Sequence, residues 1–212
     1  MKQTFRTFAA VLMLMLSMVF SSNACAQDGR AILDKAAASL KKGGVEVQFK
    51  ATTYKGLSPQ GSSQGTLKYS GSKFAVSTSE AEVWFDGKSQ WTILKSSNEV
   101  NLTEPTAQEI QQINPMSFVN LYRQKSKYTV KDVTYGGQAS KEVTVVPNKK
   151  TAFRQLIVIV SNNQVRNIRM LDAKGQWVQF KINSLKTGQH FAADVFKFDE
   201  KKFPQVEIID LR

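Results

Sequence analysis

The stretch AEVWFDGKSQWTIL, from Ala81 to Leu94, predicts a β-hairpin that carries two of the chain's three tryptophans. The segments VWF and WTIL flank Asp86-Gly87, a pair that supplies the positive φ angles of a tight turn. Trp84 and Trp91 could belong to an ordinary core or could line a surface that receives an apolar ligand. The face that each tryptophan uses stays open, because a one-residue change of register moves every side chain to the other face.

Short predicted strands, separated by turn residues, fill most of the chain on both sides of this hairpin. They are residues 45–54, 65–69, 73–77, 99–102, 128–135, 141–146, 153–160, 164–171 and 176–182. In the last of them apolar and polar residues alternate, which is typical of a sheet with one solvated face. The pattern predicts a mainly β (α+β) protein with an up-and-down antiparallel sheet curled into a barrel or half-barrel.

Two segments have helical spacing instead. Residues 28–40 place apolar side chains on one face, with Asp28 available as a cap and Gly43-Gly44 as a stop. Residues 104–124 interrupt the strands, and Asn114-Pro115 divides them into two apolar stripes. We expect one amphipathic helix before the sheet and two short helices within this interruption.

Residues 1–26 are predicted to be a secretory signal. A basic start is followed by the apolar run from Phe8 to Phe20 and by Ala24-Cys25-Ala26, which is typical of a cleavage site. The run is shorter than the roughly 20 residues of a bilayer span, and the residues before Cys25 lack the apolar position usual for a lipidated cysteine. We therefore expect a mature chain, residues 27–212, that folds as a single domain without disulfides.

The residues give little support to catalysis, metal binding or nucleic-acid binding. The formal net charge is +12, but no interleaved basic and aromatic face accompanies it. The charge fits a solvated surface, or attraction to anionic headgroups or an acidic partner. His190 stands in a polar loop without a second ligand at metal spacing, and no nucleophile or phosphate-binding motif is present. We expect no catalytic residues, metal or cofactor.

The sequence favours ligand binding over catalysis. Helices that cover one face of an open sheet either fill the space solidly or leave a cavity. The sequence alone does not separate these two outcomes. The candidate residues on the sheet are Phe49, Leu67, Phe74, Trp84 and Trp91. Those on the helices are Leu33, Ile110, Ile113, Met116, Phe118 and Tyr122.

Three features together resemble the LolA family of periplasmic lipoprotein carriers, in its Bacteroidetes-type form. The first is the hairpin motif VWFDGKSQWTI, residues 83–93, and the second is the helical interruption that follows it, residues 104–124. The third is the ending FKFDEKKFPQVEIIDLR, residues 196–212. The resemblance covers essentially the whole mature chain, and its specificity lies in the order and separation of the motifs.

The resemblance implies a half-barrel closed by a lid of short helices over an apolar cavity for acyl chains. It implies a monomeric periplasmic carrier, not an enzyme, that takes acylated lipoproteins from an inner-membrane releasing transporter. An outer-membrane receptor or the membrane itself would be the acceptor. The family's lid-latching arginine is missing here, since GTLKYSGSKF, residues 65–74, offers only Lys68 and Lys73. The alternatives are a carrier of another lipid-like ligand and a non-enzymatic envelope adaptor with a filled core.

Overall fold

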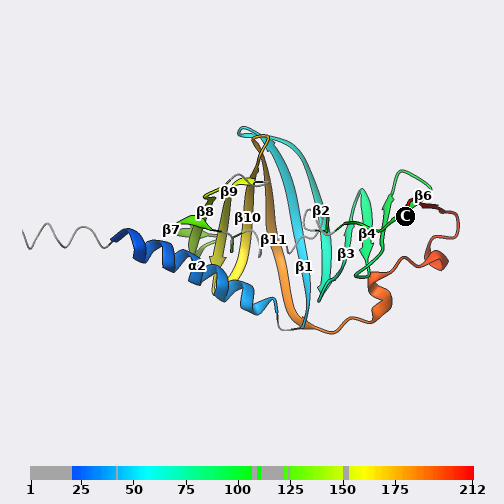
Figure 1. Cartoon of the computed structure of the whole chain (residues 1–212), viewed down its shortest axis with the longest axis horizontal. Helices are drawn as coiled ribbons and strands as arrows, with labels where there is room; N and C mark the ends of the chain where they lie inside the picture. The colour runs from blue at the N-terminus through cyan, green and yellow to red at the C-terminus, as the bar shows by residue number, and fades with distance from the viewer. Residues whose placement is uncertain (1–20, 42, 107–108, 111–121, 124, 150–152) are drawn as a thin grey trace, which may run out of the picture.

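The protein is built around one twelve-stranded sheet, seen in a computed structural model that describes residues 21–41, 43–106, 109–110, 122–123, 125–149 and 153–212. The strand order is β12-β6-β5-β4-β3-β2-β1-β11-β10-β9-β8-β7, and β12 and β7 are the two edges (Figure 1). All neighbouring strands are antiparallel except β12 and β6. The sheet is therefore an unclosed, incomplete barrel, which confirms the predicted fold class.

The strands follow the chain as a meander with two exceptions: β1 pairs with β11, which joins the two halves of the sheet, and β12 pairs with β6. Their bounds are β1 Gly44–Lys55, β2 Ser58–Ser70, β3 Lys73–Thr78, β4 Ala81–Phe85, β5 Gln90–Leu94, β6 Glu99–Thr103, β7 Ser126–Tyr135, β8 Gln138–Pro147, β9 Phe153–Ser161, β10 Gln164–Asp172, β11 Gln176–Gln189 and β12 Glu207–Asp210. Every strand expected from the sequence is present. β12 was not expected.

The turn chemistry explains most of the connections, with one correction. Asn162 and Asn163 have φ angles of 50° and 58°, as the two-residue turn between β9 and β10 requires. Asp86-Gly87 does not form the expected two-residue turn, because Phe85 pairs with Gln90 and four residues connect β4 to β5. The Asp86 carboxylate instead accepts hydrogen bonds from the backbone N–H groups of Lys88 and Ser89, at 3.0 and 2.9 Å.

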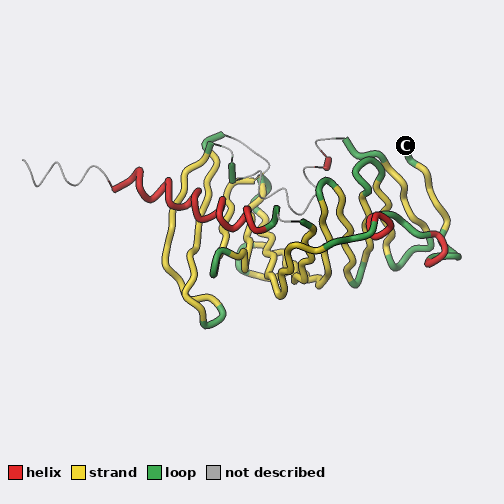
Figure 2. Tube along the Cα trace, turned by 90° about the horizontal axis from the view of Figure 1, so that it is seen from below, coloured by secondary structure: helices red, strands yellow, loops and turns green. Residues whose placement is uncertain are grey.

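The helix α2, Ser21–Ser39, packs on one half of the sheet and mainly contacts β7 (Figure 2). It begins before the expected Asp28 and ends near Gly43, whose φ is 82°. Leu33 and Ala36, both 1% exposed, join Val143 and Val158 in the main core. We call the sheet face that α2 covers the inner face, and the opposite one the outer face.

The C-terminal segment, residues 190–212, covers the outer face at the other end of the sheet (Figure 1). It contains the short 3-10 helices η2, Ala193–Phe196, and η3, Glu200–Lys202, and ends in β12 beside β6. A second group of buried side chains lies under it, separate from the main core: Ile93, Val100, Leu102 and Phe196. The two halves of the sheet are thus covered on opposite faces.

Candidate functional site

The inner face carries apolar side chains across both halves of the sheet, but α2 makes its main contacts with β7 to β10. On β11, β1, β2, β3 and β4 the inner face keeps half-buried side chains that pack against the core. We call this set the apolar patch: Phe49, Tyr69, Val76, Val83, Phe180 and Ile182. Half-buried apolar side chains that form one continuous set are the feature expected of a surface that accepts an apolar ligand.

The centre of the patch is an aromatic pair with space built around it. The rings of Phe49 on β1 and Phe180 on β11 lie edge to face, with centroids 6.1 Å apart. Phe49 lies opposite Gly65 of β2. A Cβ atom at Gly65 would lie 2.5 Å from the carbonyl oxygen of Ser77 and 3.0 Å from the Phe49 ring. Glycine at this position therefore leaves room for the ring of Phe49.

The structure brings three of the five predicted sheet residues to this face. Phe49 is half-buried, whereas Leu67 and Phe74 are 4% and 1% exposed and belong to the core beneath the patch. Phe74 packs against Phe85 with ring centroids 5.3 Å apart. Leu67 and Phe74 thus form the floor of the inner face, and Phe49 is the predicted residue that reaches its surface.

The two tryptophans, whose face the sequence left open, lie on the outer face and not with Phe49, Leu67 and Phe74. Trp84 and Trp91 are directly opposed on β4 and β5, and Phe85, next to Trp84, points to the inner face. Trp84 contacts Phe198 and Phe203 of the C-terminal segment, with centroids 5.6 and 5.7 Å away. Trp84 therefore holds the C-terminal segment against the sheet.

The predicted helical residues have three different outcomes. Leu33, a residue of α2, is buried between this helix and the sheet, and Ile110 is half-buried against the main core. Ile113, Met116 and Phe118 lie outside the described residues, so their role stays a prediction. Tyr122, 0% exposed, is part of the main core where the chain returns to the sheet.

A capping box missed by the sequence reasoning starts the helical turn that contains Ile110. The Glu109 carboxylate accepts hydrogen bonds from the backbone N–H and the hydroxyl of Thr106, at 2.8 and 2.7 Å. The Ile110 N–H donates to the Thr106 carbonyl at 2.9 Å. These bonds lower the pKa of the Glu109 carboxyl. The signal was present as the T-x-x-E spacing of TAQE, residues 106–109.

Tyr122 ties the other end of this segment to α2. Its hydroxyl donates to the Asp34 carboxylate at 3.0 Å, and the Tyr128 hydroxyl donates to the Tyr122 carbonyl. Burial, followed by the bond to Asp34, raises the pKa of the Tyr122 hydroxyl to about 12. Arg123 lies over the Tyr122 ring, 5.8 Å from its centroid, and also reaches Asp34. These contacts fix the return of the chain to the sheet.

Lys68 and Lys73, the two lysines of residues 65–74, do not point to the inner face. Lys68 pairs with Glu46 and Ala75 on the outer face, and its ammonium lies 5.9 Å from the Phe191 ring. Lys73 precedes Phe74 on β3 and so shares the outer orientation. Tyr122 and Asp34, which link α2 to the returning chain, do not correspond in position to a latch on an early strand.

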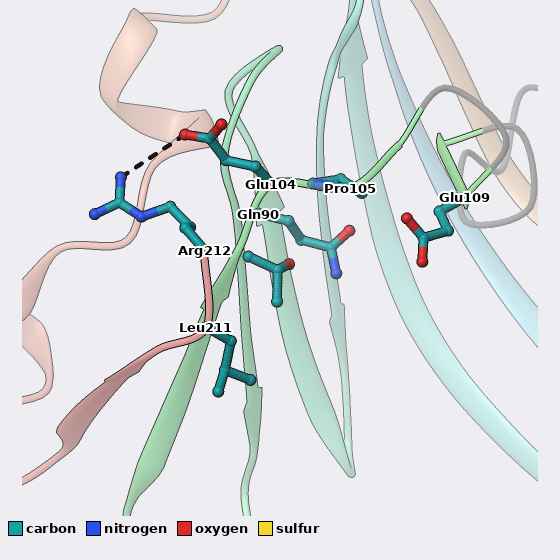
Figure 3. A pocket seen from close by; sticks show the side chains of 7 residues that line it. Gln90, Glu104, Pro105, Glu109, Leu211 and Arg212 are labelled. Carbon is teal, nitrogen blue, oxygen red and sulfur yellow. Dashed lines mark ion pairs between the residues drawn. The ribbon is translucent and has the colours of Figure 1, made fainter.

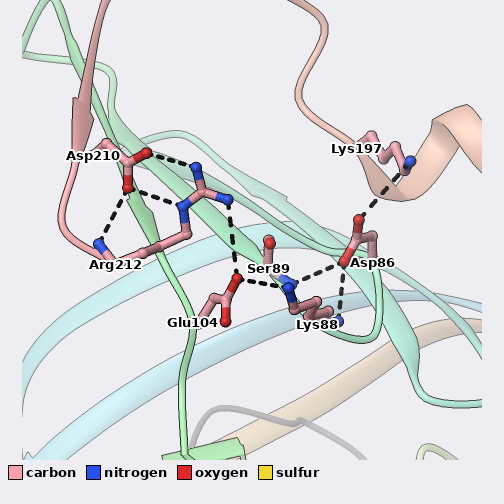
Figure 4. A network of polar contacts seen from close by, with 7 residues as sticks. All are labelled: Asp86, Lys88, Ser89, Glu104, Lys197, Asp210 and Arg212. Carbon is pink, nitrogen blue, oxygen red and sulfur yellow. Dashed lines mark hydrogen bonds and ion pairs between the residues drawn. The ribbon is translucent and has the colours of Figure 1, made fainter.

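A hollow of about 450 Å³ lies at the β6 end of the inner face (Figure 3). It is lined by Gln90, Thr103, Glu104, Pro105, Glu109, Leu211 and Arg212. Beside it a polar network joins the β4–β5 turn to the C-terminus (Figure 4). In this network Glu104 accepts from Lys88 at 3.1 Å and lies 3.9 Å from Arg212. The lining mixes polar and charged side chains with Pro105 and Leu211, unlike the apolar patch.

Within the described ranges, no group of three or more His, Cys, Asp or Glu side chains is placed to hold a metal ion. His190 is exposed at the end of β11. In the same part of the chain, the structure contains no helix with the length and hydropathy of a membrane span.

A sequence profile of the family described as "Outer membrane lipoprotein carrier protein LolA" matches residues 19–176. The chain belongs to this LolA family. The resemblance found in the sequence is thereby confirmed, although the C-terminal ending, residues 196–212, lies outside the matched range. No curated protein matches the chain.

Two solved structures are similar to this chain at low sequence identity. An uncharacterised conserved protein from Thermus thermophilus superposes with a TM-score of 0.56 at 10% identity, covering 86% of this chain and 99% of the other. A LolA superfamily protein from Nitrosomonas europaea has a TM-score of 0.42 at 11% identity, covering 80% and 97%. These likenesses concern the fold alone. The LolA family consists of carrier or binding proteins rather than enzymes.

Proposed function

We propose that this protein is a periplasmic carrier that binds the acyl chains of lipoproteins on the apolar patch and shuttles them from the inner to the outer membrane. The observation that carries the proposal is the uneven covering of the inner face. α2 closes the half formed by β7 to β10, whereas the half around Phe49 and Phe180 keeps half-buried apolar side chains. Membership of the LolA family supports the same reading.

Transfer would rest on the hydrophobic effect. Burial of a few hundred Å² of acyl chain at about 25 cal/mol per Å² contributes several kcal/mol, enough to hold a lipid without a covalent bond. The cargo would lie against the half-buried side chains around Phe49 and Phe180.

The route follows from the predicted signal and from the family. Residues 1–26 would direct export and be removed, so that the mature protein starts within the range that α2 spans. An inner-membrane releasing transporter would load the carrier, and an outer-membrane receptor or the membrane would accept the cargo. The protein would work as a monomer, without catalysis or cofactor.

Dye binding tests this proposal with two matched variants on one strand. Phe180 and Trp177 are both half-buried aromatic residues of β11, but Phe180 points to the inner face and Trp177 to the outer face, where Arg169 lies 4.9 Å from its ring centroid. The wild-type protein should enhance the fluorescence of an environment-sensitive apolar dye. Phe180→Ser should weaken dye binding about tenfold, since it removes most of one buried aromatic contact. Trp177→Ser should bind the dye as the wild type does.

Circular dichroism and urea unfolding establish that both variants remain folded. A wild-type protein that ignores the dye and also ignores an added synthetic lipopeptide would contradict the carrier. It would favour an envelope adaptor with a filled inner face. Dye binding without lipopeptide binding would indicate a carrier of a different lipid-like ligand.

A further inference from the structure

The most exposed large apolar side chain of the described residues is Leu57, which is 95% exposed. It lies in the turn between β1 and β2, where residues 55 to 62 are all exposed. A leucine with almost no neighbours gives nothing to the stability of the fold. A single exposed leucine is common on protein surfaces, so its position in the fold and the charges beside it decide what it can contact.

The hairpin that carries Leu57 projects beyond its neighbour on one side. β2 starts at Ser58, but its pairing with β3 starts only at Gly65. On the other side Lys55 pairs with Gln176, so the β10–β11 turn, residues 173–175, lies beside the β1–β2 turn (Figure 1). A Cβ atom at Gly56 or Gly175 would meet nothing within 4 Å. The two turns form one free tip of the molecule.

The charge of this tip is positive. Lys55 and Lys174 flank the exposed leucine and are themselves exposed. Residues 54–64 and 173–176 contain no Asp or Glu. The nearest carboxylate along the chain, Asp172, accepts a hydrogen bond from the Gln176 N–H at 2.8 Å and so belongs to the turn itself. The tip thus combines one apolar side chain with the ammonium groups of two exposed lysines, and the Glu80 carboxylate lies farther along β2, on the Ser63 hydroxyl.

We propose that this tip, Leu57 with Lys55 and Lys174, docks the protein on the surface of a lipid bilayer that contains anionic headgroups. Leu57 would enter the interface, and the two lysines would contact lipid phosphates. A protein partner is the less suitable occupant, because protein interfaces are centred on clusters of large side chains, whereas Leu57 is surrounded by Gly, Ser, Pro and Gln. One leucine and two lysines give weak, reversible binding, as a shuttle requires.

The tip also has a defined relation to the apolar patch. β1 and β11 lead from Phe49 and Ile182, a directly opposed pair, to Lys55 and Gln176 at the tip. Between them the inner face continues through the pairs Ala51–Phe180 and Thr53–Val178. Docking would therefore place the end of an apolar track at the membrane. This last step, delivery of acyl chains to the bilayer itself, rests on the proposed carrier function, whereas docking does not.

Vesicle flotation with the full mature protein tests docking, with phosphatidylethanolamine vesicles that contain or lack phosphatidylglycerol. Leu57→Ser should reduce the bound fraction about tenfold at limiting lipid, since one fully exposed leucine loses its burial in the interface. Leu57→Phe should restore binding. Leu211→Ser is the matched control, because Leu211 is 60% exposed at the opposite end of the sheet. It should bind as the wild type does.

The lysines are tested in the same way. The double variant Lys55→Gln with Lys174→Gln should lose about tenfold in binding to anionic vesicles and nothing on neutral ones. A double variant with the same loss of charge, Lys50→Gln with Lys131→Gln, alters two exposed lysines away from the tip and should retain binding. Equal losses in the two double variants would overturn the docking site in favour of general electrostatic attraction.

A spectroscopic variant locates the leucine. The emission of Leu57→Trp, after subtraction of the wild-type signal, should shift to the blue with anionic vesicles and be quenched by brominated lipid. No shift, or full vesicle binding by Leu57→Ser, would overturn the proposal. Dye binding by the apolar patch should be the same in Leu57→Ser and in the wild type, so failure of docking and failure of the carrier function are separate results.

Discussion

The hydroxyl of Tyr122 donates a hydrogen bond to the carboxylate of Asp34 across 3.0 Å, from the residue where the chain returns to the sheet to the middle of α2. The two residues are 88 positions apart in the sequence. Tyr122 has no exposed surface, and its hydroxyl lies 3.4 Å from the Leu33 carbonyl as well. This bond connects the helix on one half of the inner face with the segment that precedes β7.

Loss of the Tyr122 hydroxyl should destabilise the protein. Tyr122→Phe keeps the ring in the core but removes a hydrogen bond to a charged acceptor, which is worth about 2 kcal/mol. Urea unfolding followed by circular dichroism measures the change. The control is Tyr54→Phe, because the Tyr54 hydroxyl donates at the same distance, 3.0 Å, to the neutral amide oxygen of Gln179. It should cost about 1 kcal/mol or less. Equal losses would contradict a special role for Asp34.

The Tyr122 hydroxyl should lose its proton at a higher pH than an ordinary phenol does. Its pKa is raised from 10.0 to about 12, so the folded protein keeps the proton that the unfolded chain has lost. The contribution of this hydroxyl to the free energy of unfolding is therefore fully present below pH 10 and is lost as the pH rises from 10 to about 12. Ultraviolet absorbance of tyrosinate should show a late step that Tyr122→Phe removes. A titration curve that is unchanged in shape would contradict the burial of this hydroxyl.

Gly65 should tolerate no side chain, whereas Gly61 on the same strand should. An added methyl group at Gly65 would lie 2.5 Å from the Ser77 carbonyl and would press on the Phe49 ring. We expect Gly65→Ala to cost about 1 to 3 kcal/mol and to weaken apolar dye binding. At Gly61 the only neighbour within 4 Å is the Thr53 hydroxyl, at 4.0 Å. Gly61→Ala should leave unfolding and dye binding unchanged, and equal effects would contradict the crowding around Phe49.

Removal of Trp84 should loosen the C-terminal segment without affecting the apolar patch. Trp84→Ala deletes the contacts with Phe198 and Phe203, and a half-buried tryptophan at such a cluster contributes about 2 kcal/mol. Limited proteolysis should cut the variant faster after β11. Dye binding should not change. Loss of dye binding in a folded Trp84→Ala protein would contradict the placement of the tryptophans on the outer face.

The fold could be predicted from the sequence because its signals are local. The alternation in β11 and the apolar spacing of α2 each reflect a periodicity among neighbouring residues, and the structure confirms both elements. β12 escaped the prediction. It has four residues and depends on backbone pairing with β6, about a hundred positions earlier in the chain. A pairing with so distant a strand produces no periodic pattern in the sequence of β12.

The site was harder to predict, because strand register decides it. Trp84 and Phe85 are neighbours with similar apolar character, yet one faces the C-terminal segment and the other the core. No local pattern distinguishes them when both faces of a strand are covered. Phe180, in contrast, was recognised only as part of an alternating strand, although it forms the aromatic pair at the centre of the patch. Its partner Phe49 was among the candidate residues and lies on the inner face, and its role in binding stays a prediction.

Native mass spectrometry of the mature protein, purified from a Gram-negative periplasm, tests the central claim most directly. The wild-type protein and Trp177→Ser should carry co-purified acylated lipid or lipopeptide, and Phe180→Ser, still folded by circular dichroism, should have lost it. Bound mass in all three proteins would place the ligand away from the apolar patch. A ligand-free wild-type mass that stays unchanged after addition of a lipopeptide would contradict the carrier function.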